Sequence, residues 1–94
     1  MTKSVVRSIV IAELEHVQKA IGGPIVSITT DTRPIGDLAR FDSPVAEDTT
    51  ATILGRLDAD PDIKCPFTLR EEGEHLTVEK IVDYFCKAMG ITEE

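Results

Sequence analysis

Apolar residues in the first part of the chain recur with the period of an α-helix. Successive steps of 4, 4, 3 and 4 residues connect Val6, Val10, Leu14, Val17 and Ile21. This spacing places all five on one helix face, with charged and amide side chains between them. The run stops at residues 22–24, where two glycines and a proline cannot continue a helix. We therefore predict a helix over residues 3–21, with Leu14 in the core.

Residues 22–42 show no such period. Ile25, Val26 and Ile28 are compatible with a short strand, but no pairing partner is evident elsewhere, and an isolated strand is not stable. We expect an extended loop with a single turn at residues 36–38, held against the helices by three apolar side chains: Ile28, Ile35 and Leu38. A connection this long in a small domain is usually functional or structurally specific.

Residues 44–57 are predicted to form the second helix. Ser43 is a preferred N-cap residue, and Pro44 is favoured at the first helical position. Apolar side chains further along supply the face to be buried: Ile53, Leu54 and Leu57. A polar turn rich in aspartate, residues 58–62, follows the helix.

The last part of the chain predicts one short helical segment and one longer helix. We expect a single helical turn over residues 67–72, ended by Gly73. Thr77 then has the character of an N-cap, and Leu76 stands where a hydrophobic staple residue would. Apolar residues follow at helical spacing as far as Gly90, which predicts a helix over residues 78–89. The pattern as a whole predicts one all-α domain over residues 1–94, with three longer helices and one short one.

Charge narrows the classes of partner. The net charge is −7, and residues 42–94 hold thirteen acidic and five basic groups, against four acidic and five basic groups in residues 1–41. Nucleic acid and anionic membrane surfaces need clustered Lys and Arg, so we expect neither as a partner. A protein with a basic docking patch would complement the second half. A soluble domain also needs a net charge away from zero, so the charge alone favours this plainer explanation.

The cysteines and the hydropathy pattern predict the compartment. Cys65 and Cys86 form no CxxC pair, and no secretory signal precedes them. No stretch approaches the ~20 apolar residues of a membrane span. We predict a cytoplasmic monomer without a membrane span, whose cysteines are free thiols that behave as small buried apolar residues.

No group of residues has the spacing of a catalytic or metal site. His16 and His75 lie in polar contexts without ligand spacing, and we expect both at the surface or its boundary. Asp58, Asp60 and Asp62 alternate like the first ligands of a calcium loop, but the glycine and glutamate that such a loop needs further on are missing. We therefore expect a solvated turn, no metal site and no enzymatic activity.

Ser43 is the one hydroxyl whose position suggests chemistry. Taken alone, Asp42-Ser43-Pro44 favours a plain helix cap, in which the serine oxygen accepts a backbone N–H. A helix start also suits a phosphodiester, because free N–H groups and the positive end of the helix dipole face the anion. Pro44 removes one of those N–H groups. Such chemistry requires Ser43 to be exposed where the loop ends.

Six short motifs, in this order and spacing, resemble those of the acyl carrier protein family. They are Ile28-Thr29-Thr30-Asp31, Ile35-Gly36-Asp37-Leu38, Asp42-Ser43, Cys65-Pro66, Leu76-Thr77-Val78 and Val82-Asp83-Tyr84-Phe85. The resemblance extends over residues 4–89. Each motif is weak alone, and their order and spacing make the resemblance more specific.

The resemblance implies an acyl-carrier-like four-helix bundle with a long loop between its first and second helices. It implies that Ser43, flanked by Asp42, receives a 4′-phosphopantetheine arm from coenzyme A through a separate phosphopantetheinyl transferase. The thiol of the arm would hold an acyl or related group as a thioester, sheltered by the bundle core, for fatty acid or secondary-metabolite biosynthesis. Acyl-transferring or acyl-processing enzymes with basic docking patches would read the second helix at Pro44, Glu47, Asp48 and Ala51.

The chain departs from the family pattern in three ways. Pro44 replaces the usual leucine. Residues 39–41, between Asp37-Leu38 and Asp42-Ser43, are one more than usual and lack the usual glycine. The second helix is rich in threonine, and its acidic face is thinned. These changes indicate a specialised carrier, and they leave open an unmodified carrier-like module for protein–protein interaction.

Overall fold

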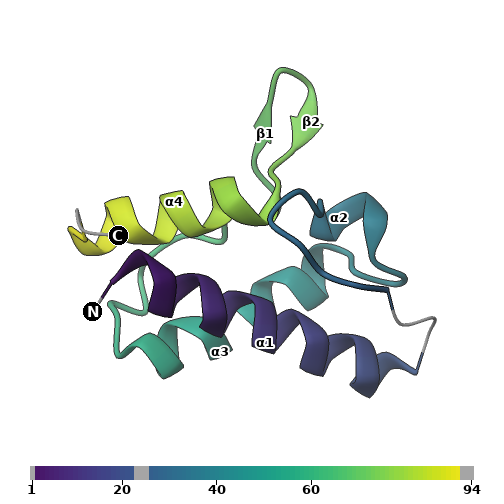
Figure 1. The fold of residues 1–94 in the computed structure, drawn as a ribbon, viewed down its shortest axis with the longest axis horizontal. Helices are drawn as coiled ribbons and strands as arrows, with labels where there is room; N and C mark the ends of the chain where they lie inside the picture. Colours follow the sequence, from purple (N-terminus) through teal and green to yellow (C-terminus); the bar gives the residue numbers. More distant parts are fainter. Residues whose placement is uncertain (1, 23–25, 92–94) are drawn as a thin grey trace.

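The computed structural model describes residues 2–22 and 26–91 and is mostly helical (Figure 1). Its helices are α1 (Lys3–Ile21), α2 (Pro34–Asp37), α3 (Ser43–Leu57) and α4 (Val78–Met89). An antiparallel hairpin of two short strands, β1 (Arg70–Glu71) and β2 (Glu74–His75), precedes α4. Helix α1 packs against both α3 and α4, and so connects the two sides of the core. No helix in the described ranges is long and apolar enough to cross a membrane.

The first and last long helices have the bounds that the sequence predicts. Thr2 and Thr77 each accept, through Oγ1, a hydrogen bond from the backbone N–H of the third helical residue, at 3.3 and 3.4 Å. At the other ends, Gly22 and Gly90 adopt left-handed angles, with φ of +78° and +74°. Glycine reaches these angles without steric cost, which is why both helices end there. Gly23 and Pro24 lie outside the described residues.

The apolar faces of the long helices form one core. Leu14 is fully buried, and so are Val6 and Val10, which confirms the predicted face of α1. Helix α3 contributes Ala46, Ile53, Leu54 and Leu57, and α4 contributes Val78, Ile81, Val82, Phe85 and Cys86. Phe41 and Phe67 pack edge to face, with ring centroids 5.3 Å apart. These two rings connect the start of α3 to the segment that precedes the hairpin.

The long connection between α1 and α3 has no regular secondary structure over residues 26–29, so no strand is present there. Ile25 lies outside the described residues. Ile28 and Leu38 are buried and Ile35 is half-buried, so the predicted contacts of this loop are confirmed. The turn expected at residues 36–38 is α2, an irregular turn over Pro34–Asp37, in which Gly36 has φ +117°.

This connection also caps α4. The carbonyl of Thr32 accepts a hydrogen bond from the Val78 N–H at 2.8 Å, and the carbonyl of Thr30 accepts one from the Glu79 N–H at 3.0 Å. The first N–H groups of a helix have no partner within the helix, so carbonyls from elsewhere stabilise its start. The loop is therefore part of the fold and not a free tether.

The helical turn predicted over residues 67–72 is wrong. That part of the chain leads into the hairpin, with Arg70 opposite His75 and Glu71 opposite Glu74. The two residues between the strands, Glu72 and Gly73, both have positive φ, +54° and +85°. A two-residue turn of this kind matches the twist of the strands, so the glycine ends no helix and instead closes a hairpin.

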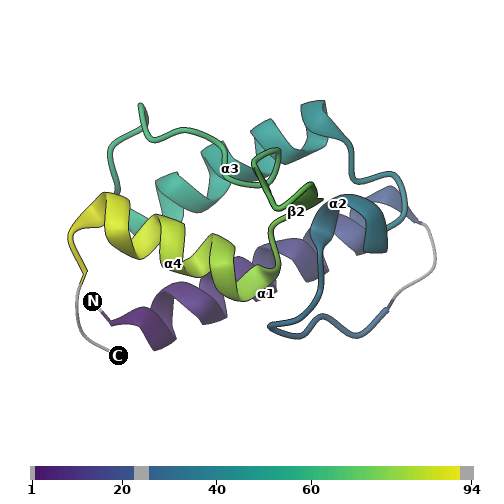
Figure 2. The same cartoon turned by 90° about the horizontal axis from the view of Figure 1, so that it is seen from above.

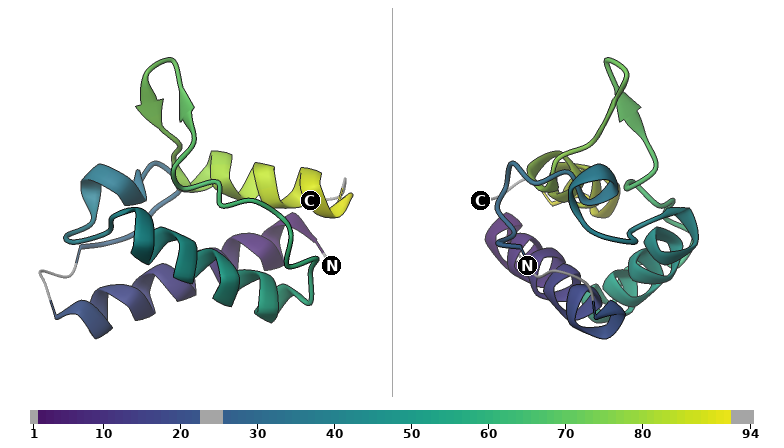
Figure 3. Two further views of the ribbon diagram at one scale, coloured as in Figure 1. Left: turned by 180° about the vertical axis from the view of Figure 1, so that it is seen from behind. Right: turned by 90° about the vertical axis from the view of Figure 1, so that its right-hand side faces the viewer.

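The hairpin projects away from the helices (Figure 3), and its base lies beside α2 when the molecule is seen from above (Figure 2). Arg33 joins the two: its Nε donates to the His75 carbonyl at 3.1 Å, and its Nη2 contacts Glu74 at 3.0 Å. The described residues thus contain three long helices, with the short one in the first connection and not before α4.

Candidate functional site

The start of α3 is built by Asp42. Its Oδ1 accepts a hydrogen bond from the Val45 N–H at 3.3 Å, and its carbonyl accepts one from the Ala46 N–H at 2.8 Å. Asp42 is therefore the N-cap, and Ser43 is the first helical residue. The prediction of Ser43 as the cap is wrong by one residue. Aspartate caps as well as serine does, and proline is tolerated at the second helical position.

Ser43 is exposed, and its hydroxyl makes no hydrogen bond with any of the described residues. A serine that served only as a cap would use its oxygen to accept a backbone N–H. Because Asp42 does this instead, the Ser43 oxygen is not committed to the fold. The exposure that modification of Ser43 requires is present.

Few backbone donors remain at this helix end. The Asp42 carboxylate occupies the Val45 N–H, and Pro44 has no N–H. Of the free N–H groups predicted to face an anion, Pro44 has none, and those of Val45 and Ala46 are bonded to Asp42. The positive end of the helix dipole remains, although the Asp42 carboxylate offsets part of it.

The four residues predicted to contact partner proteins, Pro44, Glu47, Asp48 and Ala51, are all exposed on α3. Steps of 3, 1 and 3 residues place them on one exposed face of α3, but they border two different grooves. Glu47 and Ala51 line a groove between α3 and the segment over residues 61–69. Asp48 instead lines a second groove, of about 330 Å³, between α3 and α1.

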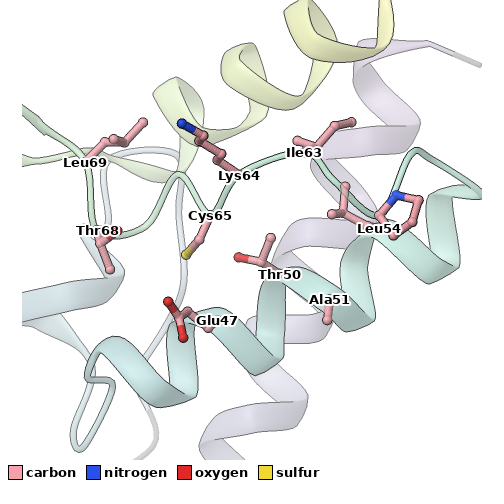
Figure 4. Close-up of a pocket in the computed structure, with 10 residues that line it drawn as sticks. Glu47, Thr50, Ala51, Leu54, Ile63, Lys64, Cys65, Thr68 and Leu69 are labelled. Atoms are coloured by element: carbon pink, nitrogen blue, oxygen red, sulfur yellow. The ribbon is translucent and has the colours of Figure 1, made fainter.

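The groove that contains Glu47 and Ala51 is hereafter called the α3 groove, and its volume is about 470 Å³ (Figure 4). Its lining residues come from α3 and from the segment opposite: Glu47, Thr50, Ala51, Leu54, Pro61, Ile63, Lys64, Cys65, Thr68 and Leu69. In Figure 4 the Cys65 sulfur points toward α3 above Glu47, whereas Lys64 extends away from α3. Thr68 and Leu69 lie near the Glu47 end, and Ile63 lies near Leu54.

The α3 groove continues the helix face on which Ser43 lies. Steps of 4, 3 and 4 residues lead from Ser43 to Glu47, Thr50 and Leu54. Residues at these spacings lie above one another on a helix. The Thr50 hydroxyl donates to the Ala46 carbonyl at 2.9 Å, and Leu54 is apolar and buried. These two side chains at the floor of the groove therefore offer few polar atoms for hydrogen bonds to a ligand.

The α3 groove was not predicted from the sequence. The spacing of residues 43, 47, 50 and 54 is visible in the sequence and could have shown one wall. The opposite wall depends on how residues 61–69 cross α3, for which no local signal exists. Cys65 was predicted to be buried, but it is half-buried at the groove, whereas Cys86 is buried; both are free thiols.

The other candidate residues lie apart from this site. His16 is exposed beside the second groove and His75 is half-buried in β2, so both histidine predictions are confirmed. The turn with Asp58, Asp60 and Asp62 is exposed, and the Asp62 N–H donates to Asp60 Oδ1 at 2.9 Å. Within the described part of the chain, no three His, Cys, Asp or Glu residues are grouped to hold a metal.

Several charge interactions join α1 to α4. Lys3 contacts Asp83 at 2.6 Å and Glu79 at 3.0 Å, and Arg7 makes two hydrogen bonds to Glu79. The hydrogen bond with Asp83 raises the pKa of Lys3, and the hydrogen bond from Arg7 lowers the pKa of Glu79. Burial raises the pKa of the Cys86 thiol, which lies on α4. None of these groups lines the α3 groove, and the pairs of Lys3 and Arg7 link α1 to α4.

The available residues fit a covalent arm at the start of α3. The Ser43 hydroxyl is exposed and uncommitted, and a groove on the same helix face begins one turn away. A scan against protein-family models, a search of curated proteins and a search of solved structures each found no match to this chain.

Proposed function

We propose that this protein is a carrier that holds acyl or related groups as thioesters on a 4′-phosphopantetheine arm attached to Ser43. The observation that carries the proposal is the Ser43 hydroxyl, which is exposed and makes no hydrogen bond with the described residues. It stands at the first residue of α3, after a long connection that the core holds in place. The motifs shared with acyl carrier proteins, taken in order, support the same function.

The fold supports the proposal as a variant of the acyl-carrier-like four-helix bundle. Three long helices and a long first connection are present. In the place where that family has its short third helix, this chain has a segment of turns and a hairpin. We propose that this change, together with Pro44, adapts the carrier to its own partners.

In the loading step, the Ser43 hydroxyl gives its proton to a base of a separate transferase and forms a new Oγ–P bond. The P–O bond to 3′,5′-adenosine diphosphate in coenzyme A breaks, and that nucleotide leaves. When bound, the arm supplies a thiol that carries an acyl group. The chain itself contributes a nucleophile held at a fixed place and needs no catalytic group of its own.

Docking of partner enzymes would use the exposed residues of α3. Asp42, Glu47 and Asp48 place negative charge around Ser43, and the net charge of the chain is −7. Complementary charge on a partner speeds association and orients the two proteins. The proposed partners are a phosphopantetheinyl transferase and acyl-processing enzymes with basic docking patches.

The test is the intact mass after incubation of the apo protein with coenzyme A and a broad-specificity phosphopantetheinyl transferase. We expect the mass to rise by one phosphopantetheine group. Ser43→Ala should abolish the gain, while Ser8→Ala, which changes an exposed serine of α1, should leave it complete. An undiminished gain in Ser43→Ala, or no gain with several such transferases, would refute the proposal.

A second candidate is an unmodified carrier-like interaction module. The scarcity of backbone donors at the start of α3 favours it, because Pro44 and the Asp42 cap leave little to bind a phosphodiester. The mass of the protein isolated from its native source separates the two. A native mass that includes the arm excludes this second candidate.

A further inference from the structure

The distance along α3 from Ser43 to the far end of the α3 groove can be compared with the length of a linear ligand. Leu54 lies eleven residues after Ser43. At 1.5 Å per residue this advance along α3 is about 16 Å. A phosphopantetheine arm has about 14 bonds between the serine oxygen and its sulfur. At the ~3.5 Å that an extended chain covers in three bonds, such an arm spans about 16 Å.

The core next to the segment over residues 61–69 is filled by well-packed side chains. Phe41 is 5% exposed and Phe67 is 1% exposed, and their rings meet edge to face at 65°. On the floor, Thr50 and Leu54 are 4% and 3% exposed. Protein interiors are packed as densely as organic crystals, so a long hydrocarbon could enter the core only by displacing these groups.

We infer that the α3 groove holds the arm along its length, and that the carried acyl group is short. This inference rests on the proposed function. The sulfur of an arm laid from Ser43 reaches the level of Leu54 and Ile63, where the groove ends. Carbons beyond the first few extend past Leu54, Ile63 and Pro61 toward Asp58, Asp60 and Asp62, whose exposed side chains offer no apolar contact.

Cys65 is a native reporter for this arrangement. It lines the groove and is half-buried, whereas Cys86 is buried within α4 and serves as an internal reference. A promiscuous transferase can load the apo protein from butyryl- or decanoyl-coenzyme A, so that the arm thiol is blocked as a thioester. The rate at which iodoacetamide alkylates Cys65 is then followed by peptide mass spectrometry.

We expect loading to slow the alkylation of Cys65 while that of Cys86 stays unchanged. An arm that occupies the groove nine-tenths of the time slows the reaction about tenfold. The melting temperatures of the butyryl and decanoyl forms should be equal, since the extra carbons stay in solvent. A melting temperature that rises with chain length would show that hydrocarbon is buried, and would overturn the short-acyl assignment.

Two neighbouring positions on α3 provide matched variants. Ala51→Trp places a large ring in the α3 groove, whereas Thr52→Trp places the same ring on the side that faces α1. Both residues are exposed, so neither change enlarges a core residue. In protein of each variant that is fully loaded by intact mass, the arm should no longer slow Cys65 alkylation in Ala51→Trp, and should slow it as in the parent in Thr52→Trp. Equal slowing in both variants would overturn the groove assignment.

The mass measured before alkylation separates the two proposals. A complete mass gain with unprotected Cys65 overturns the inference about the groove and leaves the carrier function intact. Absence of any gain overturns the carrier function, and the groove assignment fails with it.

Discussion

Asp42 and Ser43 are neighbours that both have a side-chain oxygen suited to capping a helix. Asp42 takes the capping position, with its Oδ1 3.3 Å from the Val45 nitrogen. Ser43 is thereby released from a structural role and stands exposed at the first helical residue. One side chain therefore holds the helix start, while the hydroxyl of the next makes no hydrogen bond with the described residues.

Replacing Asp42 tests its role as a cap. Asp42→Ala should lower the free energy of unfolding by about 1 kcal/mol, the usual effect of losing a cap. Asp42→Asn should keep the stability, because asparagine caps as well as aspartate. Chemical denaturation with far-ultraviolet circular dichroism measures both. Equal losses in the two variants would mean that the charge of Asp42, and not its hydrogen bond, stabilises α3.

The long helices form because each carries an apolar face that the others cover. In α1 this face is fully buried at Val6, Val10 and Leu14. The hairpin is built differently: its strands are two residues each and mostly exposed, so its turn and its contacts with Arg33 and Lys80 hold it. We therefore expect substitutions in α1 to affect stability far more than substitutions in the hairpin.

The buried face of α1 provides a direct test. Leu14→Ala should lower the free energy of unfolding by about 2–5 kcal/mol, because it removes buried methyl groups and leaves a cavity. Val5→Ala truncates a valine of the same helix that is 44% exposed, and should change stability by less than about 0.5 kcal/mol. Thermal unfolding measures both. An unchanged melting temperature in Leu14→Ala would mean that α1 buries another face.

Contacts between distant parts of the chain hold the elements in their arrangement. The carbonyls of Thr30 and Thr32 cap α4, and Arg33 joins the first connection to the hairpin. Ion pairs of Lys3 and Arg7 with Glu79 link the start of α1 to α4. Each connects residues more than forty positions apart, so the fold is closed by interactions that no local pattern contains.

The Glu79 pairs predict how acid affects stability. Because the folded protein holds the pKa of Glu79 below its ordinary value of 4.5, the unfolded chain binds more protons in that range. The contribution of the Glu79 pairs to stability is therefore present above pH 4.5. It is lost as the pH falls through the pKa that Glu79 has in the folded protein. Glu79→Gln should show a smaller loss of melting temperature on acidification than the parent.

The matched control for that experiment is Glu15→Gln, which changes an exposed glutamate of α1. It should keep the acid sensitivity of the parent. If Glu79→Gln and Glu15→Gln respond alike to acid, the Glu79 pairs do not contribute to the pH dependence. Added salt should also reduce the difference between Glu79→Gln and the parent, because it screens exposed charges.

Local chemistry was enough to predict α1 and α4 to the residue. Their starts are marked by threonine or by an apolar period, and their ends by Gly22 and Gly90. The start of α3 was predicted within one residue, because aspartate and serine compete for the same cap. The hairpin was missed because Glu72-Gly73 resembles a helix end as much as a two-residue turn. Its two strands are short and mostly exposed, so the sequence there shows no alternation of apolar and polar residues that would indicate a strand.

The order of residues by itself was sufficient for the three long helices, their buried faces and the position of Ser43 at a helix start, because these follow from spacing and capping over a few residues. The path of residues 61–69 across α3, the half-buried position of Cys65 and the α3 groove exist only in the folded chain. They depend on packing such as the Phe41–Phe67 contact, which joins residues 26 positions apart. Contacts of that kind are selected by the shape of the complete core and not by neighbouring residues.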